Sequence, residues 1–166
     1  LLSLLAVSAN NARVVVIEPQ PRRRDMALDL GASATLDPKS GAFRDGVADL
    51  THGRGFDAVI EAAGAPSAMA LALEIAAHSG RIAYAGINVG STVLAPLGLI
   101  QSKALRLRGL IGSVGVWPQT IRFIASGGVD PSRIVAATIP LSRADDALAA
   151  ARDTGSNIKV HIRISP

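Results

Sequence analysis

Cysteine is absent from this chain, and aromatic residues are scarce: its 166 residues include three Phe, one Tyr and one Trp. Without cysteine the chain can form neither a disulfide framework nor a thiolate metal site, and a reducing, cytoplasmic location is compatible with that absence. Because few rings are available to stack on bases, and because the basic residues are spread along the sequence, we expect no nucleic-acid partner.

Long hydrophobic runs are also lacking. The longest apolar opening, LLSLLAVSA at residues 1–9, is far too short to span a membrane, so we expect no membrane partner. Its small residues resemble a signal-peptide cleavage site, but neither an initiating Met nor a basic region precedes them. We interpret the run as a buried helix of an α/β protein, with a signal peptide as the alternative.

About half of the residues (49%) are apolar, which suits one globular domain with a buried core. Strand-like and helix-like segments alternate with short connections, as in a parallel sheet built from βαβ units. We expect strands at residues 13–18, 33–36, 56–62, 81–87, 105–111, 137–141 and 157–164. We expect helices at residues 21–30, 43–50, 65–77 and 117–125, and a further helix that Ser142 caps.

The most informative segment is VVVIE, an apolar run that ends on Glu18. Such a run is typical of a parallel strand that is covered on both faces. In a doubly wound sheet, ligands lie across the carboxyl ends of the strands, and an acid at the end of the second strand binds the ribose of a nucleotide. The sequence therefore predicts a nucleotide cofactor and a doubly wound, Rossmann-type parallel sheet.

A strand and a glycine-rich turn would normally precede this segment, and the sequence does not contain them. We therefore expect a sheet without its first strand, in a carboxyl-terminal piece of a longer polypeptide. The segment LRLRGLI at 105–111 alternates apolar with basic residues, which predicts a strand near the sheet edge. No metal or catalytic group is predicted: His52, His78 and His161 are far apart, and Glu61 and Glu74 form no acid–base pair.

Several stretches together resemble the carboxyl-terminal half of the medium-chain, zinc-type alcohol or polyol dehydrogenases. They are VVVIEPQPRRRDMALDLGASATLDP, GFDAVIEAAGAPSAM, SGRIAYAGI, LRLRGLIGSVGVWPQTI, ATIPLSRADDALAA and NIKVHI. The resemblance implies an NAD-binding domain at 1–128 and, at 129–166, a return segment that packs toward the catalytic domain. The zinc ligands of the family lie in an amino-terminal domain that this sequence does not contain.

The resemblance also implies roles for residues of the adenosine side. Glu18 would bind the ribose hydroxyls and repel the extra phosphate of NADP, which favours NAD over NADP. Arg23 matches a basic residue that lines the adenosine site. The alternatives are that the arginines at 22–24 form a solvated helix start or receive a phosphate.

Ala63 and Gly64 match positions that end a strand against the cofactor. On the nicotinamide side, the matching positions are Gly86, Ile87, Gly112 and Ser113. Lys159 matches a basic residue near the pyrophosphate. The alternatives are a simple turn at 63–64, a glycine kink or strand bulge at the other glycines, and a solvated lysine at 159.

The function implied is that of the cofactor-binding part of an enzyme that transfers hydride from an alcohol or polyol to NAD, with zinc bound elsewhere in the full-length enzyme. We expect this chain alone to be inactive, and we expect a homodimer or tetramer through the strand at 105–111. Two other interpretations stay open on the residues alone: a Rossmann-fold methyltransferase, and a non-enzymatic module that senses a nucleotide.

Overall fold

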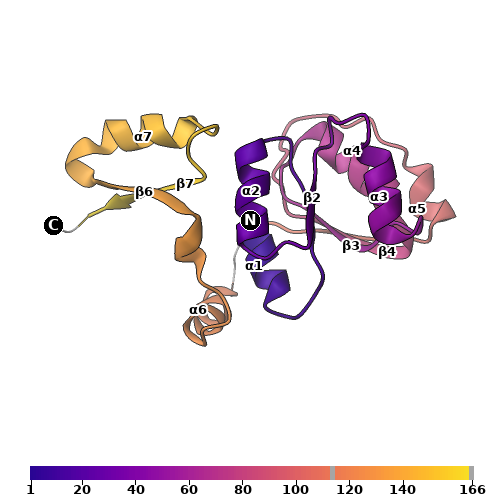
Figure 1. Cartoon of the computed structure of the whole chain (residues 1–166), viewed down its shortest axis with the longest axis horizontal. Helices are drawn as coiled ribbons and strands as arrows, with labels where there is room; N and C mark the ends of the chain where they lie inside the picture. The colour runs from indigo at the N-terminus through magenta and orange to yellow at the C-terminus, as the bar shows by residue number, and fades with distance from the viewer. Residues whose placement is uncertain (113–114, 165–166) are drawn as a thin grey trace. The chain divides into compact units, whose positions relative to one another are not determined.

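The structure is a computed structural model, and it describes residues 1–112 and 115–164. The chain forms two compact units (Figure 1), which are Leu1–Ser40 with Val116–Pro166, and Gly41–Gly115. These units group residues that pack together. They do not test the predicted division into a cofactor-binding domain at 1–128 and a return segment at 129–166, which stays a prediction. No described helix has the length and apolar character needed to cross a membrane.

The first unit contains two separate pairs of parallel strands. Its elements are α1 (Leu2–Ser8), β1 (Val15–Ile17), α2 (Pro21–Asp29), β2 (Ala34–Leu36), α6 (Trp117–Ala125), η1 (Pro131–Ile134), β6 (Val135–Pro140), η2 (Leu141–Arg143), α7 (Ala144–Arg152) and β7 (Lys159–Arg163). β1 pairs with β2, with Ile17 opposite Leu36, and β6 pairs with β7. α7 runs beside the second pair (Figure 1).

The core of the first unit is built from α1, α2 and the 3-10 helix η1. Leu4 and Leu5 of α1 are buried against Ala27, Leu30 and Ile134. α2 begins with Pro21 in its first turn and is followed by Gly31 at φ +97°, a backbone angle that favours glycine. The interpretation of the opening apolar run as a buried helix is therefore confirmed.

The predicted cap at Ser142 is wrong. Ser142 lies inside η2, and α7 begins at Ala144 without a side-chain cap. The reason is that Pro140 leads into a 3-10 turn, and the α-helix follows this turn directly. Asp146, in the first turn of α7, pairs instead with Arg143 at 2.6 Å.

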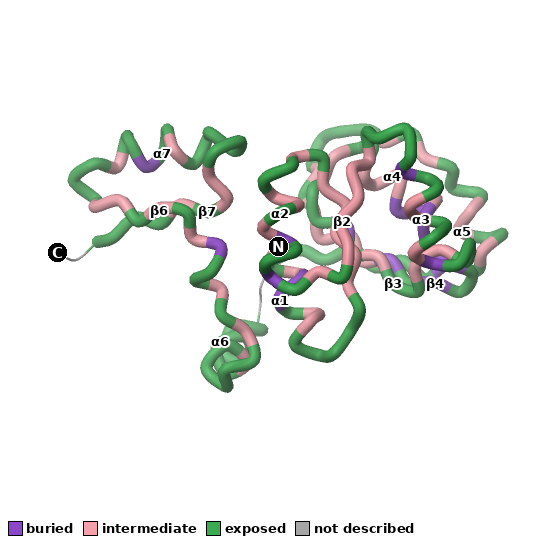
Figure 2. The backbone as a smooth tube through the Cα atoms, in the orientation of Figure 1, coloured by how far each residue is buried: buried purple, intermediate pink, exposed green. Residues whose placement is uncertain are grey.

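The second unit contains one sheet of three parallel strands in the order β3-β4-β5. Its elements are α3 (Phe43–Thr51), β3 (Phe56–Glu61), α4 (Pro66–Ile75), β4 (Ala76–Tyr84), α5 (Gly98–Ser102) and β5 (Arg106–Gly109). The core lies between one face of the sheet and the helices α4 and α5, and includes Leu73, Ile82 and Leu105. Figure 2 shows buried positions along α4 and β4.

The boundary between α4 and β4 differs from the prediction. The helix ends at Ile75 instead of residue 77, and the strand runs over Ala76–Tyr84 instead of 81–87. The Lys103 ammonium group explains the early helix end, because Nζ donates to the carbonyls of Leu73, Glu74 and Ala76 at 3.2, 2.7 and 2.8 Å. A cation at this point takes the place of the next helical hydrogen bonds.

The segment at 105–111 forms the edge of the three-stranded sheet, as predicted. The strand itself is shorter, at Arg106–Gly109, and all four of its residues are exposed. Leu105, just before it, is buried. The expected alternation of one buried and one solvated face therefore holds only at the start of the segment.

The described strands pair only in parallel and alternate with helices along the chain, as in a doubly wound fold. The predicted fold class is confirmed.

Candidate cofactor-binding site

Glu18 follows the last residue of β1 and stays at the carboxyl edge of its sheet. Its backbone N–H donates to Leu36 O at 3.0 Å, which continues the pairing of the strands by one residue. Its side-chain Oε1 accepts a hydrogen bond from the Gln20 N–H at 2.9 Å. The carboxylate is therefore held in one orientation, and the residue is only partly buried.

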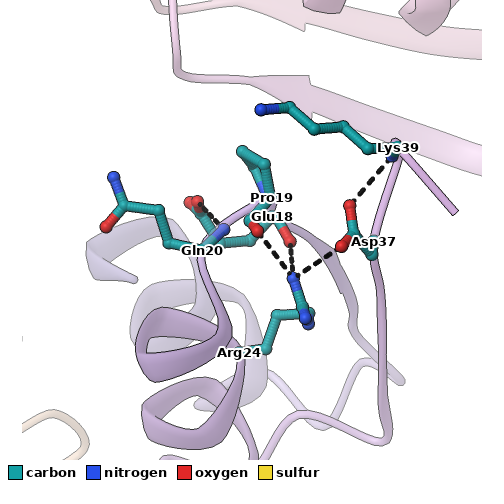
Figure 3. Close-up of polar contacts among 6 residues, drawn as sticks. All are labelled: Glu18, Pro19, Gln20, Arg24, Asp37 and Lys39. Carbon is teal, nitrogen blue, oxygen red and sulfur yellow. Dashed lines mark hydrogen bonds and ion pairs between the residues drawn. The ribbon is translucent and has the colours of Figure 1, made fainter. Parts of the chain in front are cut away.

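Arg24 joins the carboxyl ends of β1 and β2. Its Nη1 donates to the carbonyls of Glu18 and Pro19 at 2.8 and 2.9 Å, and lies 3.3 Å from Asp37 Oδ2 (Figure 3). Both side chains of this ion pair are mostly shielded from solvent. Sequence reasoning treated Arg24 only as part of the run at 22–24, as a solvated helix start or a phosphate ligand, and gave no role to Asp37, which directly follows β2.

Arg23 and Lys159, the other two predicted residues of this unit, occupy different settings. Arg23 is in the first turn of α2 and is partly buried; its Nε is buried and has no hydrogen-bond partner within the part of the chain that the structure describes. Lys159 is the first residue of β7, pairs with Val135 and is exposed. Their predicted contacts with a cofactor stay predictions.

In the second unit, the turns after β3 and β4 meet at the carboxyl edge of the sheet. A Cβ on Gly86 would lie 2.6 Å from Glu61 Oε2 and 2.7 Å from Gly64 Cα. A Cβ on Gly64, which has φ +69°, would lie 2.5 Å from Ile87 O. Only glycine fits at these two positions, so the two backbones approach as closely as they can.

The structure thus brings together Ala63, Gly64, Gly86 and Ile87. Ala63 and Ile87 are exposed on this edge, and Gly64 and Gly86 are partly buried beneath them. Gly112 follows β5 in the same sheet, with φ +68° and open space around it. Ser113 lies outside the described residues.

A cleft of about 570 Å³ lies at the opposite end of these strands. Its lining includes Gly55 and Asp57 at the start of β3, and Ala76 and His78 at the start of β4. Ligands of doubly wound folds lie at the carboxyl ends of the strands, so this cleft is not the candidate site.

Two electrostatic features bear on the chemistry of the site. Burial, together with the nearby charge of Glu61, raises the pKa of Tyr84 above its ordinary value, and the Tyr84 hydroxyl donates to Met69 O at 3.0 Å. No group of three or more His, Asp or Glu residues that could hold a metal ion occurs within residues 1–112 and 115–164. The described residues therefore do not fit a zinc site.

Comparison with known proteins places the chain in a family. The model of the zinc-binding dehydrogenases matches residues 1–126. The chain belongs to this family. The matched region includes both Glu18 and the glycine turns after β3 and β4.

Relatives of known activity are similar along most of this chain. An L-threonine 3-dehydrogenase of Pyrococcus furiosus is 32% identical over 136 residues, which are 79% of this chain and 39% of that protein. A sorbitol dehydrogenase of Bacillus subtilis is 26% identical over 151 residues, or 89% of this chain and 43% of that protein. The chain thus spans about two fifths of the length of these two relatives.

Solved structures show the same fold. L-idonate 5-dehydrogenase of Escherichia coli superimposes with a TM-score of 0.86 at 24% identity, covering 98% of this chain and 46% of that one. Two other similar structures hold cofactors: an alcohol dehydrogenase of Escherichia coli with NADH, and a zinc-binding dehydrogenase of Sinorhizobium meliloti with NADP.

Sequence reasoning found the strand-end acid Glu18 but gave no role to Glu61. The two share a signal, because each ends an apolar run with the letters VIE or AVIE. What the letters do not show is that Glu61 is buried, with 4% of its surface exposed. That difference decides what each carboxylate can do.

Proposed function

We propose that this chain forms the cofactor-binding part of an NAD-dependent alcohol or polyol dehydrogenase, with Glu18 as the residue that binds the adenosine ribose. The observation that carries the proposal is the position of Glu18. Its carboxylate is fixed by the Gln20 N–H at the carboxyl end of β1, and it remains partly exposed. An acid at this point accepts hydrogen bonds from ribose hydroxyls.

The second unit would hold the other half of the dinucleotide. A doubly wound fold consists of two mononucleotide-binding halves, so a chain that takes the adenosine at Glu18 takes the nicotinamide nucleotide at β3 and β4. The backbones of Gly64 and Gly86 approach closely, which a Cβ would prevent. Without side chains at these two positions, the nicotinamide nucleotide can lie against the backbone. Ala63, Ile87 and Gly112 would border it.

NAD is the proposed cofactor in preference to NADP, because the Glu18 carboxylate repels a phosphate on the same ribose. Solved relatives with either cofactor exist, so the choice for this chain depends on its own residues. Arg24 does not offset the repulsion, because its guanidinium group is already bound by two carbonyls and Asp37. Arg23 and Lys159 are proposed to face the adenosine and the pyrophosphate.

A nicotinamide bound there would supply the hydride acceptor for the oxidation of an alcohol. The residues of this chain contribute by orienting the cofactor and by holding the two strand-end turns rigid, since hydride transfer needs a fixed geometry. The described residues do not fit zinc, so no step through a metal is assigned to them. We therefore propose that residues 1–166 alone oxidise no alcohol. The location of the protein in the cytoplasm is a separate prediction.

The proposal is tested by replacing Glu18 in the natural polypeptide that contains this sequence. Glu18→Ala should weaken NADH binding by about 1.5–3 kcal/mol, the usual contribution of hydrogen bonds to a charged group, or roughly ten- to a hundredfold in Kd. NADPH binding should weaken less or improve. Titration of both cofactors by fluorescence measures the two constants. The exposed acid Asp25 in α2 supplies the control, Asp25→Ala, which should change neither.

An unchanged ratio of the NADH and NADPH constants in Glu18→Ala would remove Glu18 from the site. Binding of S-adenosylmethionine instead of either dinucleotide would support the methyltransferase alternative. Tight dinucleotide binding without alcohol oxidation by the natural polypeptide would support the sensing module.

We further propose that a second copy of the chain pairs along the free edge of β5. Among the described residues β5 lies at the edge of its sheet, and Leu107 within it and Leu110 and Ile111 after it are exposed. Ile111→Lys would place two like charges across such a two-fold contact. The molar mass of the natural polypeptide in solution, measured by light scattering, should therefore fall. Ile164→Lys, at a similarly exposed residue of the first unit, is the control. An assembly unaffected by Ile111→Lys argues for another interface.

A further inference from the structure

A single residue, Glu61, ties together the turns after β3 and β4. Its Oε1 accepts hydrogen bonds from the N–H groups of Ala63 and Gly64, at 2.8 and 2.9 Å. Its main-chain carbonyl accepts from Ala85 and Gly86, at 2.8 and 3.0 Å. Four backbone donors from two separate turns therefore converge on one residue at the carboxyl edge of the sheet.

Stability of the fold does not by itself explain an acid at this position. Glu61 is 4% exposed, and its Oε2 is buried without a hydrogen-bond partner among the described residues. Burying a carboxylate oxygen that has no hydrogen-bond partner costs free energy, and most buried polar atoms in proteins do have such a partner. Local costs of this kind concentrate at functional sites.

Glu18 provides a comparison within the same chain. Both residues follow an apolar strand, and both carboxylates accept the N–H of the residue two positions further on, Gln20 for Glu18 and Ala63 for Glu61. Glu18 remains partly exposed, as a ligand of the cofactor would be. Glu61 is covered, so it can act on a cofactor only through the backbone that it holds.

We propose that Glu61 is a positioning residue: its carboxylate fixes the turn at residues 62–64 against Gly86, and so sets the surface on which the nicotinamide half of the dinucleotide lies. This inference rests on the proposed function, which gives that half to β3 and β4. The reach of the side chain is the essential property, because Oε1 must span from the strand end to two consecutive N–H groups.

Two conservative variants separate reach from charge. Glu61→Gln keeps an oxygen at the distance of Oε1 and removes the charge, whereas Glu61→Asp keeps the charge and withdraws it by one methylene. The control is Glu74→Asp, since Glu74 lies in the same unit and pairs with the exposed Arg44. Each variant is made in the natural polypeptide that contains this sequence.

Two readouts are measured on each variant. Hydrogen–deuterium exchange, resolved to single amides, reports whether Ala63 and Gly64 N–H remain protected. Fluorescence titration reports the Kd of NADH. We expect Glu61→Asp to lose the protection and to bind NADH roughly tenfold more weakly, the scale of one hydrogen bond to a charged group. Glu61→Gln and Glu74→Asp should keep the protection and bind within about threefold of the natural polypeptide.

Failure of the positioning role can be told apart from failure of the proposed function. If the Ala63 and Gly64 amides stay protected in Glu61→Asp, the positioning role is overturned, whether or not the variant binds NADH. Loss of protection with unchanged NADH affinity would overturn the link to the cofactor. Stronger impairment in Glu61→Gln than in Glu61→Asp would show that charge, and not reach, is what matters. If the natural polypeptide binds no dinucleotide, the proposed function fails, and with it the inference drawn from it.

Discussion

Gly86→Ala is the substitution that the close packing at the strand ends should tolerate least. The new Cβ would lie 2.6 Å from Glu61 Oε2 and 2.7 Å from Gly64 Cα. Ordinary van der Waals contact of a Cβ begins at about 3.4 Å, so each of these contacts is too short by roughly 0.7–0.8 Å. Neither neighbour can move freely, because the carboxylate is bound to two N–H groups and Gly64 Cα is part of the backbone.

The expected cost follows from these contacts. Overpacking of a close-packed site costs about 1–3 kcal/mol, and displacing Glu61 from its N–H donors adds about 1.5–3 kcal/mol. We expect the free energy of unfolding to fall by about 2.5–6 kcal/mol, which is a large part of the stability of a small domain. The backbone of Gly86 is not in the positive-φ region, so the effect measures contact and not backbone strain.

The matched control is Gly109→Ala, at the end of β5 in the same sheet. A Cβ there would meet no atom within 4 Å, and its φ is also not positive. Its effect should stay within about 0.5 kcal/mol. Urea unfolding followed by circular dichroism measures both variants. Equal costs for Gly86→Ala and Gly109→Ala would refute the close approach of the two turns.

Two further predictions concern the second unit. Lys103→Met should lower the free energy of unfolding by about 2 kcal/mol, because three carbonyls at the end of α4 lose their cation; a loss no larger than that of the exposed Lys39→Met would contradict this. Tyr84 is the single tyrosine, so tyrosinate absorbance reports it alone. Burial and the charge of Glu61 raise the pKa of Tyr84. There is therefore a pH range in which the folded chain keeps the phenol proton and the unfolded chain has lost it. Stability is then fully present below about pH 10 and falls as the pH rises further, a fall that Tyr84→Phe should reduce.

The strand ends could be predicted because their signal is local. An apolar run too short for a helix, followed by an acid, indicated β1 and Glu18, and the same pattern indicated β3. The alternation of strands and helices was enough to predict a doubly wound fold. The resemblance supplied the glycine positions, and the structure brings Gly64 and Gly86 together.

What the sequence did not predict depends on partners that are distant along the chain. α4 ends early because Lys103, more than 25 residues further on, binds its last carbonyls. The importance of Glu61 depends on its burial beside Gly86, which spacing alone does not reveal. Ser142 has the composition of a helix cap, but the 3-10 turn after Pro140 leaves it inside the turn.

A crystal structure of the natural polypeptide with NADH bound would show whether Glu18 and the two glycine turns hold the dinucleotide. We expect the adenosine ribose hydroxyls within hydrogen-bond distance of the Glu18 carboxylate, and the nicotinamide nucleotide against the backbone of Gly64 and Gly86. We also expect the Ala63 and Gly64 N–H groups to remain bonded to Glu61. A ribose away from Glu18, or a nicotinamide that does not contact these two glycines, would contradict these expectations.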